Sequence, residues 1–366
     1  MTAGALTTAL AERKPYPWIF SPFVDLFFCC GGLFWTLVAF HLLICTQLHQ
    51  PINKMLPLEG VLLVAGGVFF ANPHVAATHL RLYGNKETRN RLWFHSYASL
   101  VVFILLIAAC VINPIVLAVL IRVYASLTFD HTLSQNYGIT LMYCYKSKYM
   151  FENWERLAIK VMFHSLTWYS VLRQFTYIEF CPKAHLGFKI PLLGPIPEPF
   201  VQTALAVLVL STLTSLFIFA RKALVSRQMV PLPAFFLIFT SLFMFTAGLE
   251  LSGAFFLFTP SFFHAAQYLV VASYYNLKEK GEAKDLAPGE FGRMVLSRAN
   301  IKYYLKLMLI GSSVFALAPF IITGSGVSFT TAWAAVFICG GFHHFLADSA
   351  IWKLKDPAVR EKLVSA

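Results

Sequence analysis

The chain of 366 residues is 58% hydrophobic and only 13% charged, and its mean hydropathy is +0.67. A water-soluble protein of this length carries about twice that charged fraction, so the composition excludes a soluble globular enzyme and indicates a helical membrane protein. The net charge of +12 does not indicate nucleic-acid binding, because the basic residues gather in short clusters at the ends of apolar segments, as they do in membrane proteins.

Apolar segments follow one another along the chain and predict about ten transmembrane helices. The expected spans are 20–48, 57–81, 92–112, 114–144, 153–180, 198–221, 231–252, 259–277, 301–323 and 327–354. Prolines at Pro114 and Pro260 predict the breaks between the third and fourth helices and between the seventh and eighth. We therefore expect an all-α, polytopic membrane bundle in which the whole chain, 1–366, is a single transmembrane domain.

Lysine and arginine predict the orientation of this bundle. They fill one set of alternating loops, starting with Arg13 and Lys14, and are sparse in the other set. The positive-inside rule then places both termini in the cytoplasm. On that side we expect an N-terminal segment (1–19), a mobile loop (278–300) and a tail (355–366). The first fourteen residues do not have the pattern of a cleavable signal peptide, and we expect a multi-pass protein of a bacterial inner membrane.

Four of the predicted helices carry ionisable residues inside their apolar stretches. Such residues are rare in membranes and usually mark a pathway or a site. They are His74, His79, His131, His264, His343, His344 and Asp348. All four helices run from the outside to the cytoplasm, so depth can be counted back from the flanking basic residue. At ~1.5 Å per residue the histidines share one layer, roughly 10–23 Å from the cytoplasmic edge.

Spacing within each helix predicts which of these side chains can meet. His344 and Asp348 are four residues apart and share a helix face. His74 and His79 are five apart, or ~140° around the helix, and need a kink to converge on one ligand. The adjacent His343 and His344 point ~100° apart, so they are expected to serve neighbouring ligands rather than the same one.

Several imidazoles with a carboxylate in an apolar bundle are suited to a transition metal. Mixed histidine and carboxylate sets with open positions are typical of non-haem iron and O₂ chemistry. Asp348 is expected either to bind the metal or to orient the ring of His344. Gln267 and Tyr268 are expected to position the substrate or a water molecule. A single histidine in a membrane helix is more often an interhelical hydrogen-bond partner, which is the interpretation for His41, His95 and His164.

Two short motifs carry a resemblance. The segment HVAATH at 74–79 and the pair in FHHFLAD at 342–348 resemble the histidine boxes of membrane-bound non-haem iron oxygenases, the desaturase and hydroxylase class, although the chain has no HxxHH triplet. The resemblance implies an oxidoreductase with one or two non-haem iron ions and O₂. It would hydroxylate, desaturate or cleave a lipid or isoprenoid-like substrate, with an electron-transfer partner on the cytoplasmic side.

Two other classes of function stay open at this stage. A proton-coupled transporter would use the histidines and Asp348 as a relay. A haem-binding membrane protein would take His131 and His264 as axial ligands. Under each alternative the expected partners include membrane lipids, and the lead interpretation adds an apolar small-molecule substrate. No interpretation includes nucleic acid.

Overall fold

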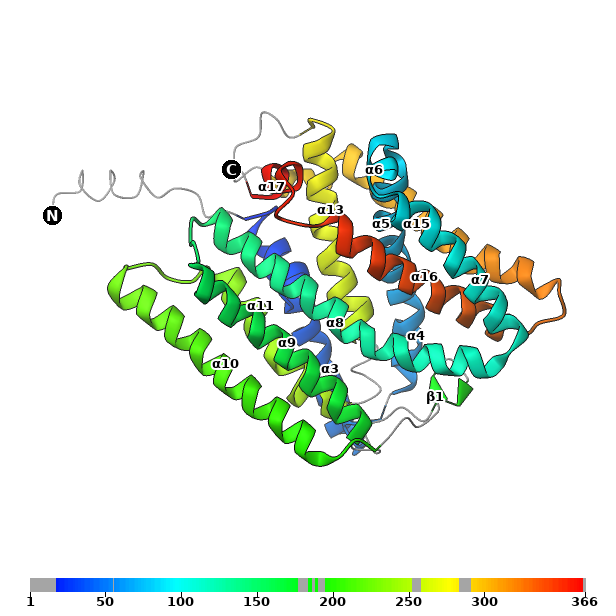
Figure 1. The fold of residues 1–366 in the computed structure, drawn as a ribbon, viewed down its shortest axis with the longest axis horizontal. Coiled ribbons are helices and arrows are strands. Elements are labelled where there is room, and N and C mark those ends of the chain that lie inside the picture. The colour runs from blue at the N-terminus through cyan, green and yellow to red at the C-terminus, as the bar shows by residue number, and fades with distance from the viewer. Residues whose placement is uncertain are drawn as a thin grey trace.

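The computed structural model describes residues 18–54, 56–176, 184–185, 188–189, 195–251, 258–282 and 291–364. Within these ranges the fold is a bundle of helices packed side by side (Figure 1). The only strands among the described residues form a two-residue antiparallel hairpin, β1 (Ala184–His185) with β2 (Phe188–Lys189). Most of the predicted segment 1–19 and the middle of the predicted loop 278–300 lie outside the described residues.

The helices follow one another in chain order. The first half of the chain forms α2 (Pro22–Val24), η1 (Asp25–Cys29), α3 (Gly32–Gln47), α4 (Pro57–Gly66), η2 (Gly67–Ala71), α5 (Asn72–Gly84), α6 (Lys86–Arg91), η3 (Phe94–Ala98), α7 (Ser99–Ile112), α8 (Pro114–Lys146) and α9 (Asn153–Thr176). The second half forms α10 (Glu198–Val225), α11 (Leu232–Met244), η5 (Ala247–Leu251), η6 (Phe258–His264), α13 (Ala265–Glu279), α14 (Phe291–Met294), α15 (Arg298–Thr323), α16 (Phe329–Ile351) and α17 (Pro357–Val364).

Six helices of the described chain are long and apolar enough to cross a membrane. They are Pro57–Gly84, Phe94–Ile112, Pro114–Lys146, Glu198–Val225, Arg298–Thr323 and Phe329–Ile351. The pair Pro22–Cys29 and Gly32–Gln47, bent by 57°, makes a seventh if it is counted as one span. By length and composition the fold is therefore that of a membrane bundle, but the predicted count of ten spans is not supported.

The remaining predicted spans fall on helices that differ from a simple apolar rod. Helix α11 has 13 residues, which at ~1.5 Å per residue covers about 20 Å of a hydrocarbon core ~30 Å thick. Helix α9 is longer but carries charged and polar side chains along its length. Helix α13 is buried along almost its whole length. It therefore packs against protein, so polar side chains on it do not face lipid.

Both prolines of the predicted breaks lie close to the first described residue of a helix. The break at Pro114 is confirmed, because α7 ends at Ile112 and the side chain of Asn113 caps α8 by accepting from the backbone N–H of Ile115 at 3.0 Å. Pro260 is the third residue of the π-helical turn η6, which continues directly into α13. The residues between η5 and η6 lie outside the described ones, so the predicted break between the seventh and eighth segments stays a prediction. π-Helical turns are frequent at functional sites.

Helices α5, α8, α16 and the segment η6–α13 surround a common centre in the bundle (Figure 1). Small residues allow the close packing next to that centre. A side chain at Gly311 of α15 would lie 2.2 Å from the carbonyl oxygen of Asn72 at the start of α5. A side chain at Gly341 of α16 would lie 2.5 Å from the ring of Tyr124 on α8. Backbones can approach this closely in membrane bundles only where the interface residue is small.

His41 is an interhelical partner, as predicted. Its Nδ1 atom lies 2.5 Å from Oε1 of Glu59 on α4, and its Nε2 atom lies 2.7 Å from the carbonyl oxygen of Ile52. Both side chains are buried. The pair therefore satisfies a histidine and a carboxylate inside the bundle and joins α3 to α4, with no atom left for a metal.

Candidate metal centre

Four histidines from four different helical segments meet at the centre of the bundle. They are His74 on α5, His131 on α8, His264 at the end of η6 and His344 on α16. One ring nitrogen of each lies within 4.8 Å of the others. His131 is partly buried and the other three are buried, so the group is enclosed by the bundle. A group of this kind could hold a metal ion.

The hydrogen bonding of these rings favours a ligand at their centre. Among the described residues, Nε2 of His74, His131 and His344 and both ring nitrogens of His264 are buried without a hydrogen-bond partner. A buried polar atom without a partner costs free energy, and one such atom in a native protein calls for an explanation. One such nitrogen from each ring is explained if four lone pairs bind one metal ion, because neutral imidazole is a good ligand for iron, zinc, copper and nickel.

The four rings are arranged so that neighbours stand nearly perpendicular. The ring centroids of His74 and His264 are 4.8 Å apart at 76°, and those of His131 and His344 are 4.9 Å apart at 78°. His74 and His131 lie opposite one another, with 6.4 Å between centroids and only 14° between planes. The rings therefore enclose a small space instead of stacking as a hydrophobic group.

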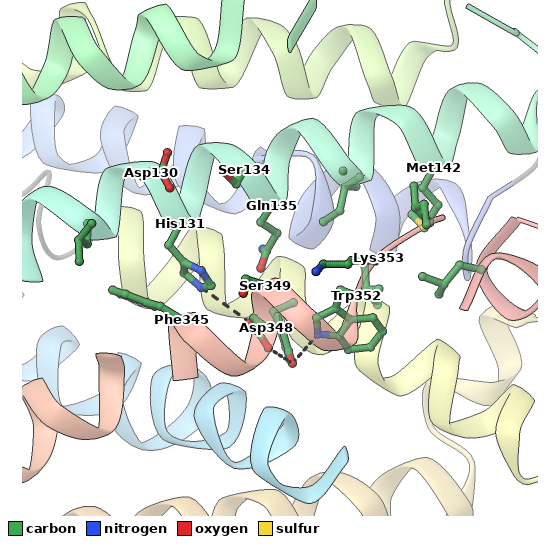
Figure 2. A pocket seen from close by; sticks show the side chains of 17 residues that line it. Asp130, His131, Ser134, Gln135, Met142, Phe345, Asp348, Ser349, Trp352 and Lys353 are labelled. Carbon is green, nitrogen blue, oxygen red and sulfur yellow. Dashed lines mark hydrogen bonds and ion pairs between the residues drawn. The ribbon is translucent and has the colours of Figure 1, made fainter. Parts of the chain in front are cut away.

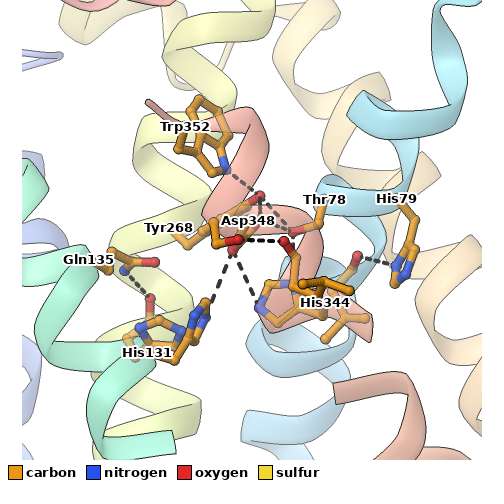
Figure 3. Close-up of polar contacts among 12 residues, drawn as sticks. Thr78, His79, His131, Gln135, Tyr268, His344, Asp348 and Trp352 are labelled. Atoms are coloured by element: carbon orange, nitrogen blue, oxygen red, sulfur yellow. Dashed lines mark hydrogen bonds and ion pairs between the residues drawn. The ribbon is translucent and has the colours of Figure 1, made fainter. Parts of the chain in front are cut away.

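Asp348 turns one carboxylate oxygen toward the same space. Its Oδ2 atom lies 3.5 Å from Nε2 of His344 and 3.8 Å from Nε2 of His131, and it has no hydrogen-bond partner among the described residues. Its other oxygen, Oδ1, accepts hydrogen bonds from Thr78 Oγ1 at 2.7 Å and Tyr268 OH at 3.0 Å (Figure 3). One oxygen is thus held by the protein and the other is free to bind a metal.

The hydroxyl of Thr78 determines the tautomer of His344. Nδ1 of this ring lies 2.8 Å from Thr78 Oγ1. The same hydroxyl donates to Asp348 and lies 2.6 Å from Tyr268 OH. With its single proton on Asp348, Thr78 can accept a hydrogen bond from Nδ1 of His344. Nε2 of His344 then carries a lone pair toward the centre. A hydrogen bond at the far nitrogen is the usual way in which a protein orients a histidine ligand.

Two residues that sequence reasoning did not select complete this network. The first is Thr78. The second is Trp352, whose Nε1 donates to Tyr268 OH at 2.8 Å. A signal for both was present in the spacing, because Thr78 is four residues after His74 and Trp352 is four residues after Asp348, on the same helix faces. Tyr268, which was selected, orients Asp348 and packs against His74 with 4.3 Å between ring centroids.

Gln267 does not face the centre. Its Nε2 donates to the carbonyl oxygen of Cys29 at 2.7 Å, and its Oε1 accepts from Gln135 Nε2 at 2.6 Å. Gln135 also donates to the carbonyl oxygen of His264 at 3.2 Å. Gln267 and Gln135 therefore tie η6 and α13 to η1 and α8, and in this way hold the backbone that carries His264.

The structure places the other two candidate ligands in a separate pair. His79 Nε2 lies 2.7 Å from His343 Nδ1. The opposite nitrogens of the two rings contact the carbonyl oxygens of Val75 at 2.8 Å and His95 at 3.0 Å. The pair occupies the faces of α5 and α16 that turn away from the four-histidine centre. The ~140° and ~100° separations expected from helix geometry account for this, because no kink brings His79 round to join His74.

A cavity of about 330 Å³ borders the centre (Figure 2). His131, Tyr268 and Asp348 form its inner end. Its walls are largely apolar and include Leu127, Ile139, Met142, Val271, Phe345, Leu354 and Leu363. A ligand in this cavity would lie against the metal centre.

Comparison of the chain with protein-family models, with curated proteins and with solved structures gave no match. The function of the chain is therefore inferred from the site itself.

Proposed function

We propose that the chain is an integral membrane metalloenzyme that binds one non-haem iron ion. The ligands would be His74, His131, His264, His344 and Asp348. The enzyme would use O₂ to hydroxylate, desaturate or cleave an apolar lipid or isoprenoid-like substrate. One observation carries the proposal, which is that buried donor atoms of these five residues face one another and have no hydrogen-bond partner among the described residues.

The donor set favours iron over the other metals that imidazole binds. A carboxylate is a harder ligand than imidazole, and histidine with carboxylate is the usual combination for non-haem iron that reacts with O₂. A single ion follows from the separation of His79 and His343 from the four-histidine group. When bound, the iron would supply O₂ activation.

The residues around the ion would orient the ligands and the substrate. Thr78 and Tyr268 hold Asp348, and Thr78 also sets the protonation of His344. The apolar cavity beside His131 would bind the alkyl part of a substrate next to the centre. Burial of the histidines excludes bulk water, which would otherwise compete for the open positions.

The packing argues against the haem alternative. A haem between His131 and His264 would need a flat slot the width of a porphyrin between the two rings. Their centroids are 4.7 Å apart, and the rings of His74 and His344 fill the space beside them. No observation in the described residues specifically favours a transporter over the enzyme.

The substrate class can be tested by comparing lipid extracts. Membranes of cells that express the wild-type chain or His344→Ala would be extracted and analysed by mass spectrometry. We expect lipid species that have gained 16 mass units (one oxygen atom), lost 2 mass units (two hydrogen atoms) or been shortened, in the wild-type extract alone. Identical extracts from both strains, with metal bound to the wild-type protein, would contradict an oxidising function on membrane lipids.

We also propose that the chain lies in a bacterial inner membrane with both termini in the cytoplasm, the ten predicted segments crossing it in turn. Reporters active in the cytoplasm should then work when fused near Asn85, Ser226, Lys284 and the C-terminus. Reporters active outside should work near Ile52 and Gly187. Placing the loop after α13 on the outside would reverse the orientation and, with it, the expected side of the electron-transfer partner.

A further inference from the structure

A second cavity, which has a polar lining, lies at the charged end of the bundle, outside the metal centre. It has a volume of about 760 Å³ and is formed by the ends of α5 and α13, the start of α15, and the helices α6 and α17. Its basic lining residues are Arg81, Arg91, Lys280, Lys302, Lys306 and Lys362, and its acidic lining residues are Glu87, Glu279, Glu282 and Asp356. We call it the basic cavity.

Arg81 is the most enclosed of these charges. Its guanidinium lies between two rings, 3.7 Å from the centroid of Tyr275 and 3.8 Å from that of Trp352. Nη2 donates to the carbonyl oxygen of Ile351 at 2.9 Å, while Nη1 is buried without a hydrogen-bond partner. No carboxylate of the described residues lies within ion-pair distance of Arg81. Arg81 as a whole is partly buried, and an enclosed charge of this kind is normally paired with an anion.

The acidic residues of the basic cavity either pair with basic residues of the same lining or are exposed. Asp356 accepts from Arg91 at 2.9 Å, and Glu279 accepts from Lys362 at 3.3 Å. Glu87 and Glu282 are exposed at the surface. Two lysines one turn apart on α15, Lys302 and Lys306, have no ion-pair partner in the described part of the chain, and neither does Lys280. These three lysines are exposed. With six basic and four acidic side chains, the lining of the basic cavity has a net charge of +2.

We propose that the basic cavity binds a phosphate-bearing anion through Arg81, Lys302 and Lys306. A guanidinium offers several N–H donors in a fixed plane that matches the oxygens of a phosphate, and lysines add mobile point charges. The volume is that of a site for a small molecule. Because the cavity lies where transmembrane helices end, the phosphate can come from an anionic lipid head group or from a soluble phosphorylated compound.

The bound anion would also contact the network around the metal centre. Trp352 covers the guanidinium of Arg81 with one face of its ring. The same indole donates to Tyr268, whose hydroxyl donates to Asp348. The chain of contacts from the basic cavity to Asp348 therefore passes through only two side chains. The binding proposal itself does not depend on which metal is bound, or on the reaction.

The test uses the full-length protein and two lysines rather than Arg81, because replacing the enclosed arginine can prevent folding. Wild type, Lys302→Gln/Lys306→Gln and the charge-matched control Lys54→Gln/Lys160→Gln would be placed in phosphatidylcholine nanodiscs. The control lysines do not line the basic cavity. Thermal unfolding would be followed while inorganic pyrophosphate is titrated at constant ionic strength, and again in nanodiscs that contain phosphatidylglycerol.

We expect the Lys302/Lys306 variant to bind the stabilising phosphate group roughly thirtyfold more weakly than wild type and control. This is the combined effect of two lost charge interactions, one from each lysine. Stabilisation by pyrophosphate identifies a soluble ligand, and stabilisation by phosphatidylglycerol alone identifies a lipid head group. If a probe stabilises all three proteins equally, or if neither probe stabilises any of them, the proposal is wrong.

Discussion

Replacing His131, His264 or His344 with alanine will strip the purified protein of its metal. Each of these rings presents a buried nitrogen without another partner to the same centre. Loss of a residue that hydrogen-bonds to a metal ligand lowers metal affinity by about 10–100-fold. Loss of the ligand itself will lower it further. Elemental analysis of wild type should show about one iron ion per chain, and the visible spectrum should lack the Soret band of haem.

Two other histidines are matched controls for this experiment. His164 lies on α9 with its ring about half exposed, 4.0 Å from Asp130. His95 contributes only its backbone carbonyl to the contact with His343. His164→Ala and His95→Ala should both retain the metal. If all five variants retain the same amount, the four-histidine group is not the metal site.

The same measurement decides between one ion and two. His79→Ala and His343→Ala should leave the metal content of the four-histidine centre intact, because the two rings contact each other and backbone carbonyls. A fall from two ions to one in either variant would show that this pair binds a second ion.

Asp348→Asn should lower metal affinity or turnover by about 10–100-fold while the protein still folds and inserts. The amide oxygen can still accept from Thr78 and Tyr268, as Oδ1 does now. The amide nitrogen, however, would take the place of Oδ2 and direct hydrogen atoms, not a lone pair, toward His344 and His131. Titration of the purified apoprotein with Fe²⁺ under anaerobic conditions measures the change.

Asp130→Asn is the control for this substitution. Asp130 lines the same cavity (Figure 2) but its carboxylate is about half exposed. The Asp130→Asn variant should therefore bind metal like wild type. Wild-type metal content and turnover in Asp348→Asn, together with a silent His344→Ala, would exclude this part of α16 from the site.

The sequence by itself determined that the chain forms apolar helices and that polar side chains gather at one depth. Residue counts from the flanking charges placed His74, His131, His264 and His344 in one layer, and the structure brings these four together. The four-residue spacing of His344 and Asp348 also predicted their shared face. Both inferences depend only on rise and rotation along one helix, which are local properties of the backbone.

Only the tertiary structure decided which faces turn inward. Helical spacing gives the angle between His74 and His79 but not which of them points to the centre, because that depends on how α5 packs against α15 and α16. The role of Thr78 depends on α5, α13 and α16 meeting at one point. Contacts between segments up to 270 residues apart, such as Thr78 with Asp348, are set by packing and leave no periodic signal in the sequence.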